Sequence, residues 1–183
     1  MQYQQEKFAN AALFFAENTD AKKLGVTKLM KLLFFADFHH FEEYGRPILG
    51  DTYYHLPEGP VPTASYELYK DTFKGKKETG LEKFIQVVTD KVKDYEIQRI
   101  EPLQKLDEGV FSKSDLEILE KTAKKFYDTT GTTMSKVAND IPFIKETPQV
   151  YPIDYLEAID NEEDKKYLAE LQKEEEEVDS HLS

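Results

Sequence analysis

The longest apolar run of the chain predicts a buried helix over residues 27–44. Nine residues between positions 29 and 41 are Leu, Met, Phe or Ala, and a helix that is apolar nearly all round is typical of the middle of a helical bundle. Thr27 is the expected N-cap, and Gly45 is the expected left-handed residue that ends the helix. The rest of the chain is therefore expected to pack around this helix.

The few polar residues of this helix each have an expected place. Lys28 and Lys31 are expected on the solvent-facing side. Asp37 falls on an apolar stripe, where an unpaired buried carboxylate would be costly. We therefore expect Asp37 to find a partner in His40 or Arg46 and to pin the following loop to the helix.

Glycine and proline punctuate the segment after the helix and predict an irregular loop held by turn chemistry. These residues are Gly45, Pro47, Gly50, Pro57, Gly59, Pro60 and Pro62. Residues 4–17 carry apolar side chains at helical spacing and predict an amphipathic helix that rests on the central one. A third helix is expected over residues 62–73, directly after the loop.

Short runs of β-branched and aromatic residues predict a small β element. Residues 84–88 and 95–100 are expected to form a hairpin or two edge strands, and residues 53–56 are a candidate third strand. The predicted fold class is mainly α (α+β). It is a compact helical domain around a buried central helix, with a two- or three-stranded antiparallel β element.

Helical periodicity returns in the second half of the chain. Ser114 and Glu117 have the S-x-x-E spacing of a capping box at the start of one helix, and a shorter helix is expected over residues 132–141, ended by Pro142. The two helices have a helix-turn-helix outline, yet the shorter one carries few donors for phosphates or base edges. Direct nucleic-acid binding is therefore not expected.

Acidic residues are concentrated at the C-terminal end. The net charge of the chain is −12, and residues 154–183 contribute −9 of it with 12 Asp or Glu and 3 Lys. A last helix is expected over residues 161–171. Residues 1–172 are thus predicted to form one domain and residues 173–183 an acidic, frayed tail.

Composition favours a cytoplasmic protein with no membrane partner. The absence of cysteine excludes disulfides and thiolate chemistry. No apolar run reaches the roughly 20 residues that cross a bilayer, and the N-terminal MQYQQEKF lacks a basic region followed by an apolar one.

Asp37, His40 and His55 are the best candidates for a metal site. Asp37 and His40 share a helix face, and His55 or Asp51 could close the site from the loop. However, no HExxH or G-x-S-x-G motif is present, and Ser65 has no evident base. We therefore expect a binding or structural module without a cofactor or an enzymatic activity. A metal-dependent hydrolase or nuclease-like enzyme that uses Asp37, His40 and His55 is the alternative.

Several short motifs of the central stretch belong together. They are K-L-x-K-L-L-F-x-A-D-x-x-H ending at His40, YGRPI at 44–48, Gly50 with Asp51, and G-P-V-P at 59–62 followed by Tyr66 and Leu68. In these motifs the chain resembles the Panacea antitoxin domain, also called the SocA-like or phage-associated GepA-like family. The later FSKSDLEILEKTAKKFYDTTGTTMSKVAND resembles the second helical half of the family, with Asn139 or Asp140 where a histidine is often found. The resemblance covers roughly residues 5–170.

The resemblance implies a mostly helical domain with a small β element that acts as an antitoxin. Such a domain neutralises a cognate protein toxin, encoded nearby, by direct binding, and at least one relative hands its toxin to a ClpXP protease. The motif residues would build the scaffold first and face the partner second. They are Asp37, His40, Tyr44, Gly45, Arg46, Pro47, Gly50, Asp51, Gly59, Pro60, Val61, Pro62 and Tyr66. A phage accessory protein that binds another host factor is a further alternative.

Overall fold

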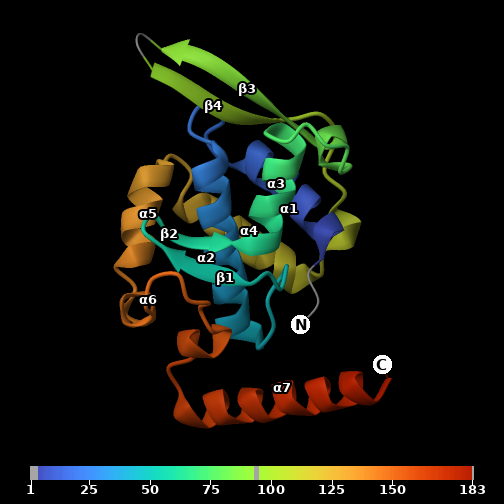
Figure 1. Ribbon diagram of the computed structural model, residues 1–183, viewed down its shortest axis with the longest axis vertical. Helices are drawn as coiled ribbons and strands as arrows, with labels where there is room; N and C mark the ends of the chain where they lie inside the picture. The colour runs from blue at the N-terminus through green and yellow to red at the C-terminus, as the bar shows by residue number, and fades with distance from the viewer. Residues whose placement is uncertain (1–3, 93–94, 183) are drawn as a thin grey trace.

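The computed structural model describes residues 4–92 and 95–182 and is built around helix α2 (Val26–Tyr44) (Figure 1). The predicted central helix is confirmed, and Gly45 ends it with a φ of 69°. The predicted N-cap is wrong, because Gly25 occupies that position and no side chain caps the first turn.

Side chains of α2 contribute to two apolar clusters. Leu29, Leu32 and Leu33 belong to the larger cluster, which also contains residues from the first part of the chain and from the helices after residue 112. Phe34, Phe38 and Phe41 of the same helix belong to the smaller cluster, which residues 138–159 complete. An α-helix apolar nearly all round is stable here because both clusters remove its surface from water.

Three further helices belong to the predicted bundle. Helix α1 (Gln5–Asn18) and helix α3 (Thr63–Phe73) lie where the sequence predicts them. Helix α4 (Lys113–Lys125) contacts both α1 and α2. The predicted mainly helical architecture is therefore confirmed.

A β-hairpin extends from one end of the molecule (Figure 1). Strands β3 (Ile85–Val92) and β4 (Tyr95–Pro102) pair antiparallel, with Val87 opposite Ile100. The predicted hairpin is confirmed, and its strands are longer than expected. The short 3₁₀ helix η1 (Leu81–Lys83) leads into it.

The predicted third strand belongs to a separate sheet. Strand β1 (Tyr53–Leu56) pairs antiparallel with β2 (Gly59–Pro62) and not with β3 or β4. Residues 150–153 run along the other edge of β1, where the Ile153 amide donates to the Tyr53 carbonyl at 2.8 Å. The C-terminal half of the chain thus covers this edge.

The N-terminus of α4 uses a different capping box from the predicted one. The Ser112 hydroxyl accepts from the Asp115 amide at 3.1 Å, and the Asp115 carboxylate accepts from the Ser112 amide at 3.1 Å. Ser114 and Glu117, the predicted pair, lie two residues further along the chain. Two serines two positions apart offered two overlapping boxes, and the one that starts after the 3₁₀ helix η2 (Glu108–Val110) is formed.

The segment after α4 differs from the prediction at one proline. Helix α5 (Gly131–Asn139) is capped by the Thr130 side chain and matches the expected short helix. Pro142 does not end a helix but occupies the first position of the next one, α6 (Pro142–Glu146). Proline suits that position, because the first helical residues need no amide hydrogen bond.

The acidic end of the chain forms one long helix. After the 3₁₀ helix η3 (Tyr155–Ala158), α7 (Glu162–Leu182) lies at the end of the molecule away from the hairpin (Figure 1). It continues past Leu171, where we expected it to stop. The division into a domain of residues 1–172 and a tail of residues 173–183 stays a prediction. Among the described residues, no helix is both long and apolar enough to cross a membrane.

Candidate functional site

Asp37 of α2 is fully buried and accepts four hydrogen bonds. Its Oδ1 accepts from the amides of Ile48 and Leu49 at 3.0 and 2.8 Å. Its Oδ2 lies 3.1 Å from the hydroxyls of Tyr53 and Tyr155. The expectation that Asp37 pins the loop to the helix is therefore confirmed, although all of its partners are neutral donors.

Charge on Asp37 is disfavoured by its surroundings. Burial raises the pKa of this carboxyl to about 6, and the hydrogen bonds from Leu49, Tyr155 and Tyr53 offset only part of that effect. Burial next to Asp37 also raises the pKa of both tyrosine hydroxyls well above their usual value. Asp37 is consequently poised to hold a proton in mildly acidic conditions.

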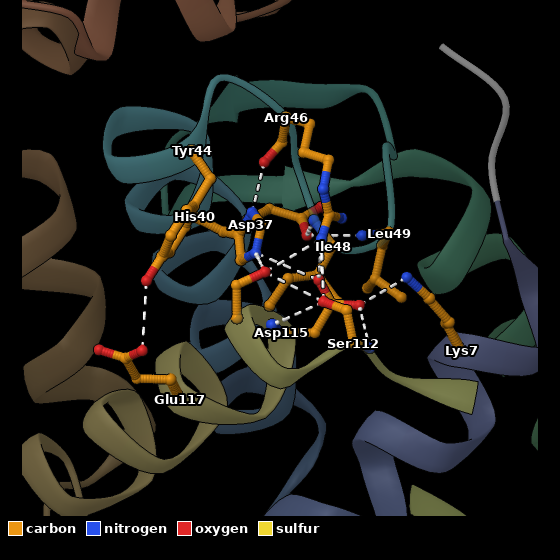
Figure 2. A network of polar contacts seen from close by, with 11 residues as sticks. Lys7, Asp37, His40, Tyr44, Arg46, Ile48, Leu49, Ser112, Asp115 and Glu117 are labelled. Atoms are coloured by element: carbon orange, nitrogen blue, oxygen red, sulfur yellow. Dashed lines mark hydrogen bonds and ion pairs between the residues drawn. The ribbon is translucent and has the colours of Figure 1, made fainter. Parts of the chain in front are cut away.

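A second buried carboxylate, Asp115, has charged partners (Figure 2). Lys7 Nζ lies 2.7 Å from its Oδ2, and His40 Nε2 and Arg46 Nη2 lie 3.1 and 3.0 Å from its Oδ1. The Ser112 amide adds the capping contact. From the sequence we expected His40 or Arg46 to be the partner of Asp37. That expectation is wrong, because both side chains contact Asp115 instead.

The surroundings of Asp115 favour its ionised form. Burial alone would raise its pKa, but hydrogen bonds from His40, Lys7 and the Ser112 amide outweigh burial and hold the pKa well below its usual range. Asp115 therefore joins α1, α2, the loop after α2 and α4 through charge-assisted contacts.

His40 connects the end of α2 to this ion cluster. Its Nδ1 lies 2.6 Å from the Arg46 carbonyl. A carbonyl oxygen can only accept, so Nδ1 must carry a proton and donate it. The Arg46 side chain turns the other way, to Asp115 and to the hydroxyls of Ser112 and Ser114 at 2.9 and 3.1 Å.

Asp51 caps helix α3 from a distance. The N-cap residue Pro62 offers no side-chain acceptor, and the first amides of a helix need one. The Asp51 carboxylate accepts from the amides of Ala64 and Ser65 at 2.9 and 2.8 Å, and from the Ser65 hydroxyl at 2.7 Å. The Gly-Asp motif thus fixes the direction in which α3 leaves the loop.

Lys28 and Lys31 are buried, contrary to expectation. Each is 1% exposed, and their ammonium groups donate to the carbonyls of Tyr127 and Pro60 at 2.7 and 2.6 Å. Burial lowers the pKa of Lys28 and lowers that of Lys31 to about 8. Gly59 has a φ of 90°, and a Cβ there would lie 3.1 Å from Asn139 Oδ1 and 3.2 Å from Lys31 Nζ, so a larger residue would be strained and crowded at this position.

A family model described as antitoxin SocA-like, Panacea domain, matches residues 29–142. The chain belongs to this family. No curated protein and no solved structure matches it. The matched range of the Panacea domain includes Asp37 and Asp115, while their partners Tyr155 and Lys7 lie outside it.

The remaining motif residues of the Panacea domain hold turns or reach the surface. Gly50 has a φ of 68°, Pro47 and Val61 are half-buried, and the Tyr66 ring stacks on Tyr69. Tyr44 is exposed, and its hydroxyl donates to the Glu117 carboxylate at 3.2 Å (Figure 2).

The candidate metal ligands of the Panacea domain do not converge. Asp37 and His40 bind the separate partners given above, and His55 Nδ1 donates to the Thr147 carbonyl at 2.7 Å. In residues 4–92 and 95–182 no three His, Asp or Glu side chains are grouped so that they could hold a metal ion. The alternative enzyme is thus left without a ligand set in that part of the chain.

Four residues of this polar network were not singled out in the sequence. They are Lys7, Tyr53, Asp115 and Tyr155. Only Asp115 had a local signal, since Ser112 and Asp115 have the spacing of a capping box. The other three meet their partners through the fold alone. The network can anchor and orient segments, and its exposed edge includes Tyr44 with Glu117 and Arg46 with Ser112.

Proposed function

We propose that this protein is an antitoxin that neutralises a protein toxin, encoded beside it, by binding the toxin directly. The observation that carries the proposal is the Panacea-domain match over residues 29–142. The polar groups of the motif support it in one respect. Most of them are buried and bonded to other segments of the chain, so toxin binding falls to the surface that this scaffold displays.

The acidic charge of the chain favours a basic partner. With a net charge of −12, the protein attracts a positively charged toxin and raises its rate of encounter at low ionic strength. Helix α7 carries much of this charge on an exposed surface. A toxin of low or negative net charge would remove this support.

The test is to express each adjacent gene product in cells, alone and together with this protein, and to measure growth. We expect one neighbour to be toxic, its toxicity to be relieved by this protein, and the two chains to co-purify at constant stoichiometry. A neighbouring toxin that is neither relieved nor bound would contradict the proposal.

The same experiment distinguishes binding from delivery to a protease. Direct neutralisation predicts rescue and a stable toxin level in cells with or without a ClpXP-type protease. Rescue that depends on the protease, with loss of the toxin, would indicate a proteolytic adaptor and would contradict neutralisation by binding alone.

A further inference from the structure

A groove crosses the molecule between α2, α4, α6 and η3. It has a volume of about 650 Å³, which is within the range of sites that hold several side chains or a small ligand. The groove is separate from the Asp115 ion cluster, because neither Asp115 nor its cationic partners line it.

The floor of the groove is aromatic. Phe34, Phe35 and Phe38 line it from α2, Phe126 from the end of α4 and Phe143 from α6. Phe35 packs on Phe126 with ring centroids 4.5 Å apart, and Phe38 stacks on Phe143 at 5.7 Å. These contacts fix the rings, so the floor is preformed.

The rim of the groove leaves an apolar side chain open to water. Val137 of α5 lines the groove and is 41% exposed. An aromatic floor with an apolar residue at the rim is the arrangement that binds a large apolar anchor from a partner.

Some charges at the rim are already neutralised within the protein. Lys121 Nζ lies 2.9 Å from Glu117 and 3.2 Å from Glu43. Glu157 lies 2.9 Å from Lys165. These charged groups therefore need no ion-pair partner from another protein.

Three other carboxylates of the rim have no ion pair with any residue that the structure describes. They are Glu42 of α2, Glu146 of α6 and Asp160 after η3, and all three are exposed. Lys125 lines the groove without an ion pair among the described residues, and its Nζ lies 5.4 Å from the Phe126 ring centre. The wall away from α4 is therefore acidic.

We propose that this groove binds a segment of the toxin in which a large apolar side chain is flanked by lysine or arginine. The inference rests on the proposed function and adds the place and the chemistry of binding. The apolar anchor removes from water the surface that Phe35, Phe143 and Val137 still expose. The flanking cations pair with Glu42, Glu146 and Asp160, which steers the segment into one orientation.

The boundary of the family match passes through the groove. Phe34, Phe126 and Val137 lie within the matched residues 29–142, whereas Glu146 and Asp160 lie beyond them. The shared part of the domain thus supplies four of the five floor rings, all but Phe143, and the segment beyond the match supplies most of the acidic wall. The acidic wall therefore determines which toxin the groove binds.

The experiment compares the wild-type protein with two charge-reversal variants of equal net charge. One carries Glu42→Lys, Glu146→Lys and Asp160→Lys. The control carries Glu17→Lys, Glu78→Lys and Glu108→Lys, which are exposed carboxylates without ion pairs among the described residues and away from the groove. Kd for the purified toxin is measured by calorimetry, after circular dichroism has checked that each variant is folded.

We expect the groove variant to raise Kd by about tenfold or more and the control to change it by less than about threefold. Val137→Glu, which keeps the groove acidic but breaks its apolar rim, should also raise Kd by about tenfold. Hydrogen exchange in the wild-type complex should be slowed at residues 137–146 and 157–160. This measurement needs no variant.

The possible failures have distinct meanings. Equal Kd values for the groove variant, Val137→Glu and the control, without slowed exchange at the groove, would overturn the groove site and leave the antitoxin proposal standing. A wild-type protein that binds no neighbouring toxin would overturn the proposed function itself. A free protein that dimerises through the groove, and loses the dimer on Val137→Glu, would assign the groove to a second copy and overturn the inference.

Discussion

Asp37 and Asp115 are two fully buried carboxylates that need polar partners and find them in different kinds of group. Asp37 accepts from two amides and two tyrosine hydroxyls, and none of these donors is charged. Asp115 lies within ion-pair distance of a lysine, an arginine and a histidine. Both hold the loop after α2, one through its backbone and the other through Arg46.

The difference sets the protonation of the two groups. Neutral donors offset little of the cost of burying a charge, so the pKa of Asp37 rises to about 6. Cations favour the charge, so the pKa of Asp115 falls well below its usual range. The surroundings of Asp37 therefore favour its protonated form and those of Asp115 its ionised form, although the residue type and the exposure are the same.

The largest expected effect is the removal of either carboxylate. Asp115→Ala removes the one acceptor that the Lys7 ammonium has among the described residues and leaves His40 Nε2 there with only the Ser114 hydroxyl at 3.0 Å, and we expect it to lower the free energy of unfolding by about 3–5 kcal/mol. Asp37→Ala leaves two amides and the Tyr53 hydroxyl without their acceptor, while the Tyr155 hydroxyl keeps the Asp51 carbonyl at 2.8 Å, and it should cost about 3 kcal/mol. Denaturant unfolding of both variants at pH 7 measures these losses. A wild-type stability in either variant would show that its aspartate is not part of the core.

The contrast between the two aspartates could be predicted only in part. The apolar pattern of residues 29–41 predicted the central helix and, from it, the burial of Asp37 and its attachment to the loop. The identity of the partners was beyond the pattern, because Tyr155 lies 118 positions further along the chain and nothing local marks it. Sequence spacing favoured His40, which the fold turns toward Asp115.

The two lysines of α2 show a second limit of prediction from the sequence pattern. Helical periodicity places charged residues on the wet face, but a helix covered on all sides has no wet face. Lys28 and Lys31 are accommodated by carbonyls at Tyr127 and Pro60, which come from a loop and from β2. The resemblance to the Panacea domain, which the family match confirms, carried no information on these contacts.

The second prediction concerns pH and follows from the opposite pKa shifts. Asp37 has a pKa of about 6 in the folded protein and 3.8 as its ordinary value. Between these values the folded state holds more protons than the unfolded state, so stability falls as pH rises from 4 to 7. The expected loss from this group is about 3 kcal/mol, on the conversion of about 1.4 kcal/mol per pKa unit.

Thermal unfolding between pH 4 and pH 8 tests this loss against a matched variant. Asp37→Asn has no carboxyl to titrate, so its stability relative to wild type should increase by about 3 kcal/mol from pH 4 to pH 7. The stabilisation from Asp115 has the opposite sign, since its pKa is lowered. It is present above pH 3.8 and is lost as pH falls below that value. A constant difference between wild type and Asp37→Asn would contradict the raised pKa.

The third prediction compares the amide substitutions at pH 7. In Asp37→Asn the side-chain oxygen still accepts from Ile48 and Leu49 and the new amide group donates to the two tyrosine oxygens, but the Tyr53 hydroxyl proton loses its acceptor. We therefore expect a cost of about 1 kcal/mol. In Asp115→Asn the amide faces three cationic or donor groups without a countercharge. Its expected cost is about 2–3 kcal/mol. Equal costs in denaturant unfolding would mean that charge does not distinguish the two sites.

The smallest expected effect separates the cations around Asp115. The Arg46 side chain is 46% exposed and that of Lys7 14% exposed, so solvent screens the Arg46 pair more strongly. Arg46→Gln should lower the free energy of unfolding by about 1 kcal/mol or less. Lys7→Gln should cost more, because it removes the 2.7 Å contact from the drier side of the carboxylate. Unfolding at low and at high salt checks the assignment, since screening by salt should reduce the Arg46 effect and leave most of the Lys7 effect. A larger loss for Arg46→Gln than for Lys7→Gln would place the main countercharge of Asp115 at the surface, and the contrast with Asp37 would then rest on solvent access.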